Sequence, residues 1–149
     1  MAALTRLAIV TPSALKFDGD AELVVAPGAA GDLGALANHA PLLTTLRTGV
    51  VSANVVSGTD GVDPNAPKGS GVQRVQFAVA GGFMQVLADR VTILTDLALS
   101  RDEIDVEAAR TDLKRAEEAL AQKRGADDAQ ERRDVAWAQA RLAITARPV

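Results

Sequence analysis

Two patterns of hydrophobic and polar positions divide the chain near residue 100. Before that point, short runs of aliphatic and β-branched residues alternate with segments rich in Gly, Pro and Asp. Short strands at a spacing of roughly 8–12 residues are typical of a β-sandwich or barrel. The runs lie at 7–10, 23–26, 50–56, 75–79, 85–88 and 91–95. Because no helical pattern separates them, we expect an all-β N-terminal domain, a β-sandwich, over residues 1–99.

Turn-forming residues separate these runs. The turn signals lie at 17–20, 27–28, 48–49, 81–82 and 89–90. Gly, Pro and Asp favour turns because of their backbone freedom, fixed φ and local hydrogen bonding, respectively. The stretch 57–71 is longer, is rich in Gly and Pro, and has a single Val. Such a stretch has almost nothing to bury, so we expect it to be a flexible hairpin tip.

After residue 100 the hydrophobic period becomes helical. Ser100 and Glu103 have the spacing of a capping box. Apolar residues then recur every three or four positions, at Val106, Ala109, Leu113, Ala116 and Leu120. This narrow seam suits one facing helix. Lys-Arg-Gly at 123–125 indicates a helix end, and Asp127 and Asp128 can cap a second helix. The sequence therefore predicts an antiparallel α-helical hairpin over residues 100–149.

The second helix of this hairpin has two apolar faces. Val135, Ala138 and Leu142 share one face, whereas Trp137 and Ile144 lie on the other. One face should pack on the first helix. The other should pack either on the β domain or on another protein, and the pattern alone leaves both alternatives open.

Composition excludes several classes of function. The chain has 149 residues, no Cys, one His, no Tyr and a net charge of −3. Disulfides, thiolate metal sites and multi-histidine metal sites are therefore excluded, and we expect no metal. Few aromatic residues and a negative charge argue against a nucleic-acid partner. The start of the chain lacks the features of a signal peptide, and we expect a soluble cytoplasmic protein.

Catalytic motifs are also missing. His39 is a conceivable general base, but no nucleophile can be named beside it, so a small hydrolase is a weak alternative. The glycines at 28, 31 and 34 lack the Gly-Lys-Ser/Thr ending of a phosphate-binding loop. From the residues alone we expect a non-enzymatic binding module with no catalytic residue and no cofactor. A free-standing module with a helical dimerisation hairpin is one form of it.

One segment narrows the range of functions that this binding module could have. The run from Pro27 to Thr44, Pro-Gly-Ala-Ala-Gly-Asp-Leu-Gly-Ala-Leu-Ala-Asn-His-Ala-Pro-Leu-Leu-Thr, resembles the hallmark segment of the ε subunit of F-type ATP synthases. Matches follow in order at 46–49, 77–86, 91–94 and 104–105. The resemblance thus extends over nearly the whole chain.

The resemblance implies a place in a rotary machine. In this family the β-sandwich attaches to the γ subunit and to the c-ring, within the central stalk that couples proton flow to ATP synthesis. The subunit performs no bond chemistry. Its helical hairpin folds onto the sandwich or extends towards the catalytic α/β subunits, and in many members the extended form inhibits ATP hydrolysis. The implied location is peripheral, at the cytoplasmic face of the bacterial inner membrane, which the subunit reaches only through the complex.

The resemblance also implies roles for single residues. By position, Asp32 and His39 face the c-ring or γ. The basic residues Arg132, Arg133 and Arg141 are candidates for contacts with the catalytic subunits. The alternative for these arginines is a solvated helix face with local ion pairs, such as Asp128 with Arg132.

Some members of the family bind ATP through an Ile/Leu-Asp-x-x-Arg-Ala motif. Here Ile104 and Asp105 match, but Ala108 stands at the Arg position and Arg110 comes two residues late. Loss of the guanidinium removes the group best suited to a phosphate. Ile104 and Asp105 are therefore expected to be a weak remnant of that site.

Overall fold

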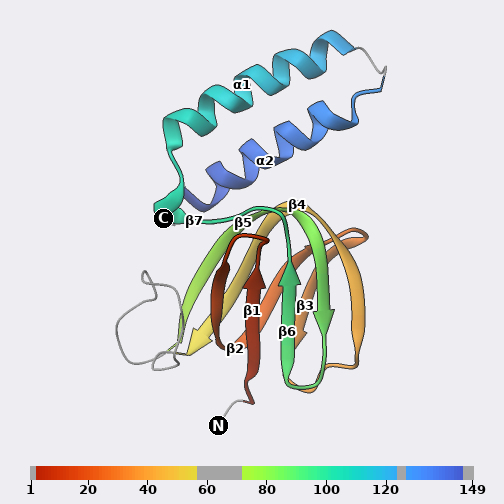
Figure 1. The fold of residues 1–149 in the computed structure, drawn as a ribbon, viewed down its shortest axis with the longest axis vertical. Coiled ribbons are helices and arrows are strands. Elements are labelled where there is room, and N and C mark those ends of the chain that lie inside the picture. The colour runs from red at the N-terminus through yellow and green to blue at the C-terminus, as the bar shows by residue number, and fades with distance from the viewer. Residues whose placement is uncertain (1–2, 57–71, 124–126, 146–149) are drawn as a thin grey trace.

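A computed structural model describes residues 3–56, 72–123 and 127–145, and shows a β-sandwich followed by a helical hairpin (Figure 1). The strands are β1 (Thr5–Val10), β2 (Leu15–Gly28), β3 (Gly31–Leu36), β4 (Leu42–Val56), β5 (Val72–Val86), β6 (Arg90–Leu94) and β7 (Ala98–Ser100). A short 3-10 helix, η1 (Arg101–Glu103), leads to α1 (Val106–Lys123) and α2 (Ala129–Thr145). The predicted fold class is confirmed. The predicted hairpin tip at 57–71 lies outside the described residues.

The sandwich is built around three long strands. The strand order is β1-β6-β5-β4-β2-β3, and β1 also pairs with β2, so the strands close on themselves. Pairing is antiparallel except between β1 and β6, which run parallel. The strand β3 pairs with β2 alone among the described strands and so forms an edge. This edge position is important for the site described below.

Side chains at every second position along the strands fill the core. In β1, Thr5, Leu7 and Ile9 are buried while the residues between them are partly exposed. The rings of Phe17 and Phe77 pack at 5.9 Å between centroids. Most of the other core residues are Ala, Val, Leu or Ile, as the low aromatic content predicts.

Three predicted turns are wrong. Residues 17–20 lie inside β2, where Arg6 of β1 binds Asp18 at 2.7 Å and Asp20 at 3.5 Å. This cross-strand ion pairing makes two acidic residues acceptable in a strand. Residues 48–49 and 81–82 lie inside β4 and β5.

Gly81 and Gly82 have φ of 80° and 122°, so they bend β5 without ending it. A Cβ on Gly82 would lie 2.1 Å from the carbonyl oxygen of Leu94, so this close approach requires glycine. The strand β3 was not predicted, because its sequence Gly-Asp-Leu-Gly-Ala-Leu carries two glycines and no β-branched residue.

The start of the hairpin is close to the prediction. The Glu103 carboxylate accepts hydrogen bonds from the Ser100 backbone N–H at 3.0 Å and from the Ser100 hydroxyl at 3.1 Å. This box begins η1, whereas α1 is capped separately by Asp105, whose Oδ1 accepts from the Ala108 N–H at 3.1 Å. The buried residues of α1 are Ala109 and Ala116, both on the predicted seam.

The helix α2 lies between α1 and the sandwich (Figure 1). Ala140 and Ile144 of α2 are buried together with Ala78 of β5. Val50, Ile104 and Trp137 pack around this cluster, which we call the docking cluster. The Trp137 face of the second helix therefore meets the β domain, which settles the alternative that the sequence left open.

Candidate functional site

An exposed apolar face covers part of the sheet formed by β4, β5 and β6. Thr45, Phe83 and Leu94 lie opposite one another across these strands, and Leu43 lies two residues before Thr45 on the same side. Leu43 is 71% exposed, Phe83 52% and Leu94 51%. We call Leu43, Phe83 and Leu94 the apolar face. Large apolar side chains gathered on one surface are a mark of an interaction site.

A groove of about 380 Å³ adjoins the apolar face. It is lined by Val10, Thr11, Pro12, Gly82, Phe83, Leu94, Thr95 and Asp96. The two threonine hydroxyls donate to nearby backbone carbonyls, of Ala14 and of Leu97, each at 3.1 Å. Because its hydroxyls are satisfied locally, the groove suits an apolar side chain of a partner better than a charged small molecule.

The turn between β2 and β3 forms a polar tip beside the apolar face. Asp32 lies there with 67% of its side chain exposed. Arg47 of β4 donates from Nη2 to Asp32 Oδ1 at 2.5 Å and from Nη1 to the Gly28 carbonyl oxygen at 2.7 Å. Arg47 follows Thr45 by two residues, so it belongs to the same side of β4 as the apolar face.

His39 lies at the other end of β3. It sits in the connection to β4, after Asn38, which adopts a left-handed conformation with φ of 64°. The His39 Nδ1 is 2.7 Å from the carbonyl oxygen of Ala40. The structure does not bring Asp32 and His39 together, because β3, a six-residue strand about 20 Å long, separates them.

Each of the three arginines singled out on α2 has a partner within the hairpin. Arg132 Nε pairs with Asp128 Oδ1 at 2.9 Å, which is the local ion pair that the sequence predicts as the alternative. Arg133 donates to Gln130 Oε1 at 3.0 Å. The third residue, Arg141, is different because it joins the two helices.

Arg141 is the most covered of these arginines, with 13% of its side chain exposed. Its Nη2 pairs with Asp112 Oδ2 of α1 at 3.0 Å, and its guanidinium lies 5.4 Å from the centroid of the Trp137 ring. This arrangement combines an ion pair with a cation–π contact. Arg132 and Arg133 are exposed, so they are more accessible to a partner than Arg141.

The remnant of the nucleotide motif is occupied by structural contacts. Ile104 packs in the docking cluster, and the Asp105 carboxylate caps the first turn of α1. Arg110, the displaced arginine, pairs with Glu107 at 2.9 Å. An anion at this helix start would therefore compete with the Asp105 carboxylate for the same backbone amides.

A second groove, of about 340 Å³, lies between α1 and α2. Its lining includes two acids and two arginines, and consists of Asp112, Arg115, Ala116, Ala119, Asp134, Trp137 and Arg141.

Over residues 3–56, 72–123 and 127–145, no group of three or more His, Asp or Glu is placed to hold a metal ion. Within the same ranges, no helix has the length and hydrophobicity needed to cross a bilayer.

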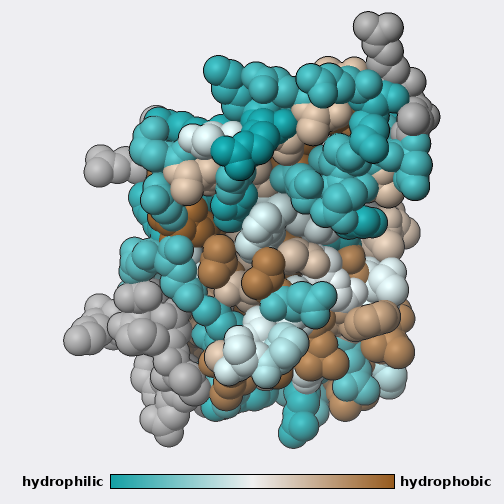
Figure 2. Space-filling view, turned by 45° about the horizontal axis from the view of Figure 1, so that its top comes forward, coloured by the Kyte–Doolittle hydropathy of each residue, from teal (hydrophilic) through white to brown (hydrophobic). Residues whose placement is uncertain are grey.

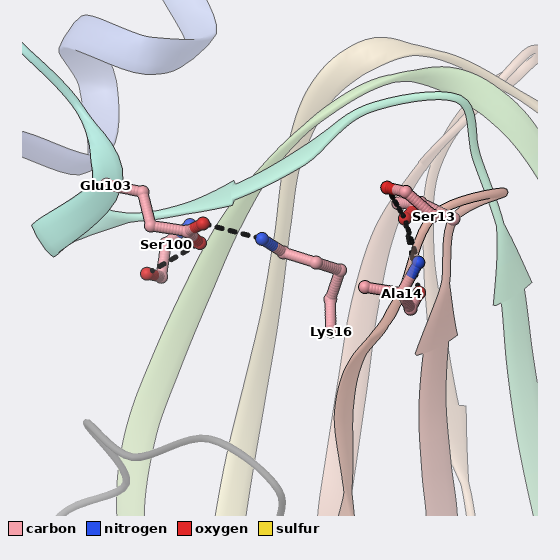
Figure 3. A network of polar contacts seen from close by, with 6 residues as sticks. Ser13, Ala14, Lys16, Ser100 and Glu103 are labelled. Carbon is pink, nitrogen blue, oxygen red and sulfur yellow. Dashed lines mark hydrogen bonds and ion pairs between the residues drawn. The ribbon is translucent and has the colours of Figure 1, made fainter.

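One ion pair fastens the base of the hairpin to the sandwich. Lys16 Nζ of β2 lies 2.6 Å from Glu103 Oε2 of η1, as Figure 3 shows. No other ion pair between described residues joins the strands to the segment after β7. Partial burial opposes ionisation of Glu103, but hydrogen bonds from Lys16 and Ser100 outweigh it and lower the pKa of this carboxyl.

Two kinds of residue were missed at the sequence level. Leu43, Arg47 and Phe83 were noted only within the segments that carry the resemblance, and Leu94 was counted as a strand residue. Their common exposure depends on strand register, which the sequence pattern did not specify. A signal was present at Phe83, since a large aromatic residue directly follows a Gly-Gly pair that bends the strand.

Comparisons with known proteins agree on one family. A family model described as "ATP synthase, Delta/Epsilon chain, beta-sandwich domain" matches residues 4–63. The ATP synthase epsilon chain of Desulforamulus reducens is 40% identical over 120 residues, covering 80% of each chain. ATP synthase epsilon chain 1 of Methylococcus capsulatus is 38% identical over 143 residues, 96% of this chain and 88% of that one.

A solved structure supports the same fold. The match is to a chain in the Euglena gracilis mitochondrial ATP synthase, in a structure of OSCP, F1 and the c-ring, with a TM-score of 0.72 at 21% identity. It covers 95% of this chain and 81% of that one.

Proposed function

Since the chain belongs to the ATP synthase epsilon-chain family, we propose that it is a non-catalytic subunit of the central stalk of a proton-translocating F-type ATP synthase. In this role it links the c-ring and the γ subunit to the catalytic head. It is peripheral to the membrane, at the cytoplasmic face of the bacterial cell membrane, and it contacts the membrane only through the complex. Residues 1–99 are the attachment unit, and residues 100–149 are the regulatory unit.

The apolar face is the observation that carries this proposal. A group of large apolar side chains is exposed at Leu43, Phe83 and Leu94. A partner that covers this group would remove its apolar surface from water, which is favourable. Figure 2 shows apolar patches over the sandwich, whereas the visible surface of the hairpin is mostly hydrophilic. An apolar centre with a polar rim is the usual anatomy of a protein interface. We assign the apolar face to the γ subunit.

Asp32 and His39 supply the polar rim. They lie at the two ends of the edge strand β3, and Asp32 is joined through Arg47 to the strand that carries Leu43. In this proposal Asp32 and His39 contact the c-ring or the part of γ next to it. The two residues need not touch each other to serve one extended interface.

Co-purification of the stalk tests the attachment. Phe83→Glu places a charge at the centre of the apolar face, so γ and c-ring subunits should no longer co-purify with the chain from detergent extracts of membranes. Leu4→Glu is the matched control, because Leu4 is also exposed but precedes β1 at the end away from the groove. Both variants should keep the melting temperature within a few degrees, since exposed substitutions usually cost no more than about 0.5 kcal/mol.

Retention of γ by a folded Phe83→Glu variant would contradict this docking surface. Self-association through the hairpin with no γ bound would instead favour the free-standing module that dimerises by its helices. The measurement therefore separates the two non-enzymatic functions that fit the sequence.

The hairpin supports a second role, in regulation of ATP hydrolysis. Among the described residues, its contact with the sandwich is centred on the small docking cluster and the Lys16–Glu103 ion pair. A contact of this size suits an element that exchanges one surface for another. In the extended arrangement, Arg132 and Arg133 are the exposed basic residues that we assign to contacts with the catalytic subunits.

A further inference from the structure

We infer that Arg47 is a positioning residue: it holds the Asp32 tip against β4, so that Asp32 and the apolar face form one continuous surface for the stalk partner. This inference rests on the proposed function. It concerns how the surface is built, since neither the family match nor the attachment to γ assigns a role to Arg47.

The need for such a residue follows from a break in the sheet. The pairing between β2 and β4 is regular from Leu23 to Val25 and then shifts register before Gly28. Beyond this register shift, Gly28 pairs with Leu46 and is the last residue of β2 in register with β4. Two hydrogen bonds hold the turn to β4 at this point: the Ala29 N–H donates to the Thr45 carbonyl oxygen at 2.9 Å, and the Arg47 side chain donates to the Gly28 carbonyl oxygen at 2.7 Å.

The turn itself is too tight to be braced from within. A Cβ on Gly28 would lie 2.7 Å from the Gly31 carbonyl oxygen, and Gly31 has φ of 138°. A side chain therefore has no room at Gly28, and the positive φ of Gly31 favours glycine there. The support must come from the neighbouring strand, and the guanidinium of Arg47 reaches both arms at once, binding Gly28 on β2 and Asp32 on β3.

An arginine is suited to this task for a geometric reason. Its N–H groups lie in a fixed planar fork, so that one can bind a backbone carbonyl while another binds a carboxylate. A lysine has a single nitrogen on a flexible stem and does not provide that geometry. Arg47 thus fixes the orientation of the Asp32 carboxylate before any partner arrives.

The carboxylate stays accessible in spite of this contact. Asp32 keeps 67% of its side chain exposed, and Arg47 binds its Oδ1. It can therefore still accept a hydrogen bond from an N–H or O–H group of a partner. Thr45 lies between Arg47 and Leu43 on the same side of β4, so the oriented acid adjoins the apolar face.

A double-mutant cycle tests the inference in the assembled complex. The measured quantity is the dissociation constant of the full chain for a γ–c-ring preparation. Asp32→Ala and Arg47→Gln should each weaken binding by about fivefold, the upper range for exposed ion pairs. If Arg47 acts through Asp32, adding Arg47→Gln to Asp32→Ala should cause no further loss.

Two controls make the cycle specific. Arg74→Gln removes another exposed arginine, which donates to Ser52 from β5, and should leave binding unchanged. Arg47→Lys keeps the charge but not the fork, so it should behave like Arg47→Gln. Melting temperatures should stay unchanged across the series, because a surface pair of this kind adds little to stability.

The outcomes distinguish this inference from the proposed function. If Arg47→Gln weakens binding equally with and without Asp32, Arg47 contacts the partner itself and the positioning role is wrong. If neither Asp32→Ala nor Arg47→Gln weakens binding while Phe83→Glu abolishes it, the inference fails and the docking face stands. If Phe83→Glu also binds normally, the proposed function fails.

Discussion

At the scale of single residues, the Lys16–Glu103 pair gives the base of the hairpin a dependence on pH. Glu103 is held below its ordinary pKa of 4.5 by Lys16 and Ser100. A lowered folded-state pKa contributes stability that is present above the unfolded value and is lost as pH falls through the folded value. The stability that the ionised Glu103 carboxylate adds to the folded state should therefore be complete at pH 7 and disappear in acid.

Glu103→Gln is the corresponding experiment. At pH 7 it should lower the free energy of unfolding by no more than about 1 kcal/mol, because the 39% exposed Glu103 side chain is screened by solvent. The difference from wild type should shrink as pH falls below the ordinary value of 4.5 and vanish in strong acid, where the wild-type carboxyl is also protonated. Urea titrations followed by the fluorescence of Trp137, the single tryptophan, measure the free energy of unfolding at neutral pH and in acid. Asp102→Asn, an exposed neighbour in η1, is the control, and a difference that persists in acid would contradict the assignment.

At the scale of secondary structure elements, the two halves of the chain should differ in local stability. The seam between the helices alternates Val or Leu with Ala, and its buried positions in α1 are Ala109 and Ala116. Each methylene that is absent from a buried site forgoes about 0.8 kcal/mol. By contrast, β5 is paired with β4 along its whole length.

Hydrogen exchange should reveal this difference. Amides of α1 should exchange through local opening at least about tenfold faster than the buried ladder amides of β5, because the described part of α1 packs mainly on α2 and not on the sheet. Amides around the docking cluster in α2 should be intermediate. Equal protection in α1 and β5 would show that the hairpin and the sandwich unfold as one unit.

The individual helices, strands and turns differ in how well the sequence predicts them. The hairpin was predicted well because its signals are local: the Ser100–Glu103 box, the seam, and Asp128 directly before α2. The prediction of a turn at 81–82 was wrong because a Gly pair indicates either a turn or a bend within a strand. Only the close approach to Leu94 decides between these two. The strand β3 was missed because its stability comes from pairing with β2 and not from its own composition.

The candidate site was predicted less completely for a related reason. Asp32 and His39 came from the resemblance, whereas the Arg47–Asp32 contact joins residues on different strands. Such contacts depend on register and on the register shift between β2 and β4, neither of which leaves a periodic pattern in the sequence. The apolar face depends in the same way on the alignment of three strands.

At the scale of the whole molecule, the two proposed roles, attachment and regulation, are assigned to different parts of the structure. The hairpin lies across one end of the sandwich (Figure 1), whereas the apolar face lies on the outward side of β4, β5 and β6. In the proposed roles, a change in the position of the hairpin would therefore leave the docked sheet undisturbed. This separation is what a subunit needs if it is to remain on the rotor while its helices move.

Removal of the hairpin tests its regulatory role in the complete enzyme. Deletion of residues 101–149 should leave γ and the c-ring bound, because the apolar face and the Asp32 tip are intact, and should raise ATP hydrolysis by the complex. Arg132→Gln with Arg133→Gln should give part of the same rise, since each exposed ionic contact is worth at most about 1 kcal/mol. Arg110→Gln, which breaks an exposed pair on α1, should have no effect. If the truncated complex assembles and its hydrolysis rate is unchanged, the hairpin is not an inhibitor in this enzyme, and the arginine pairs of α2 serve only the helix itself.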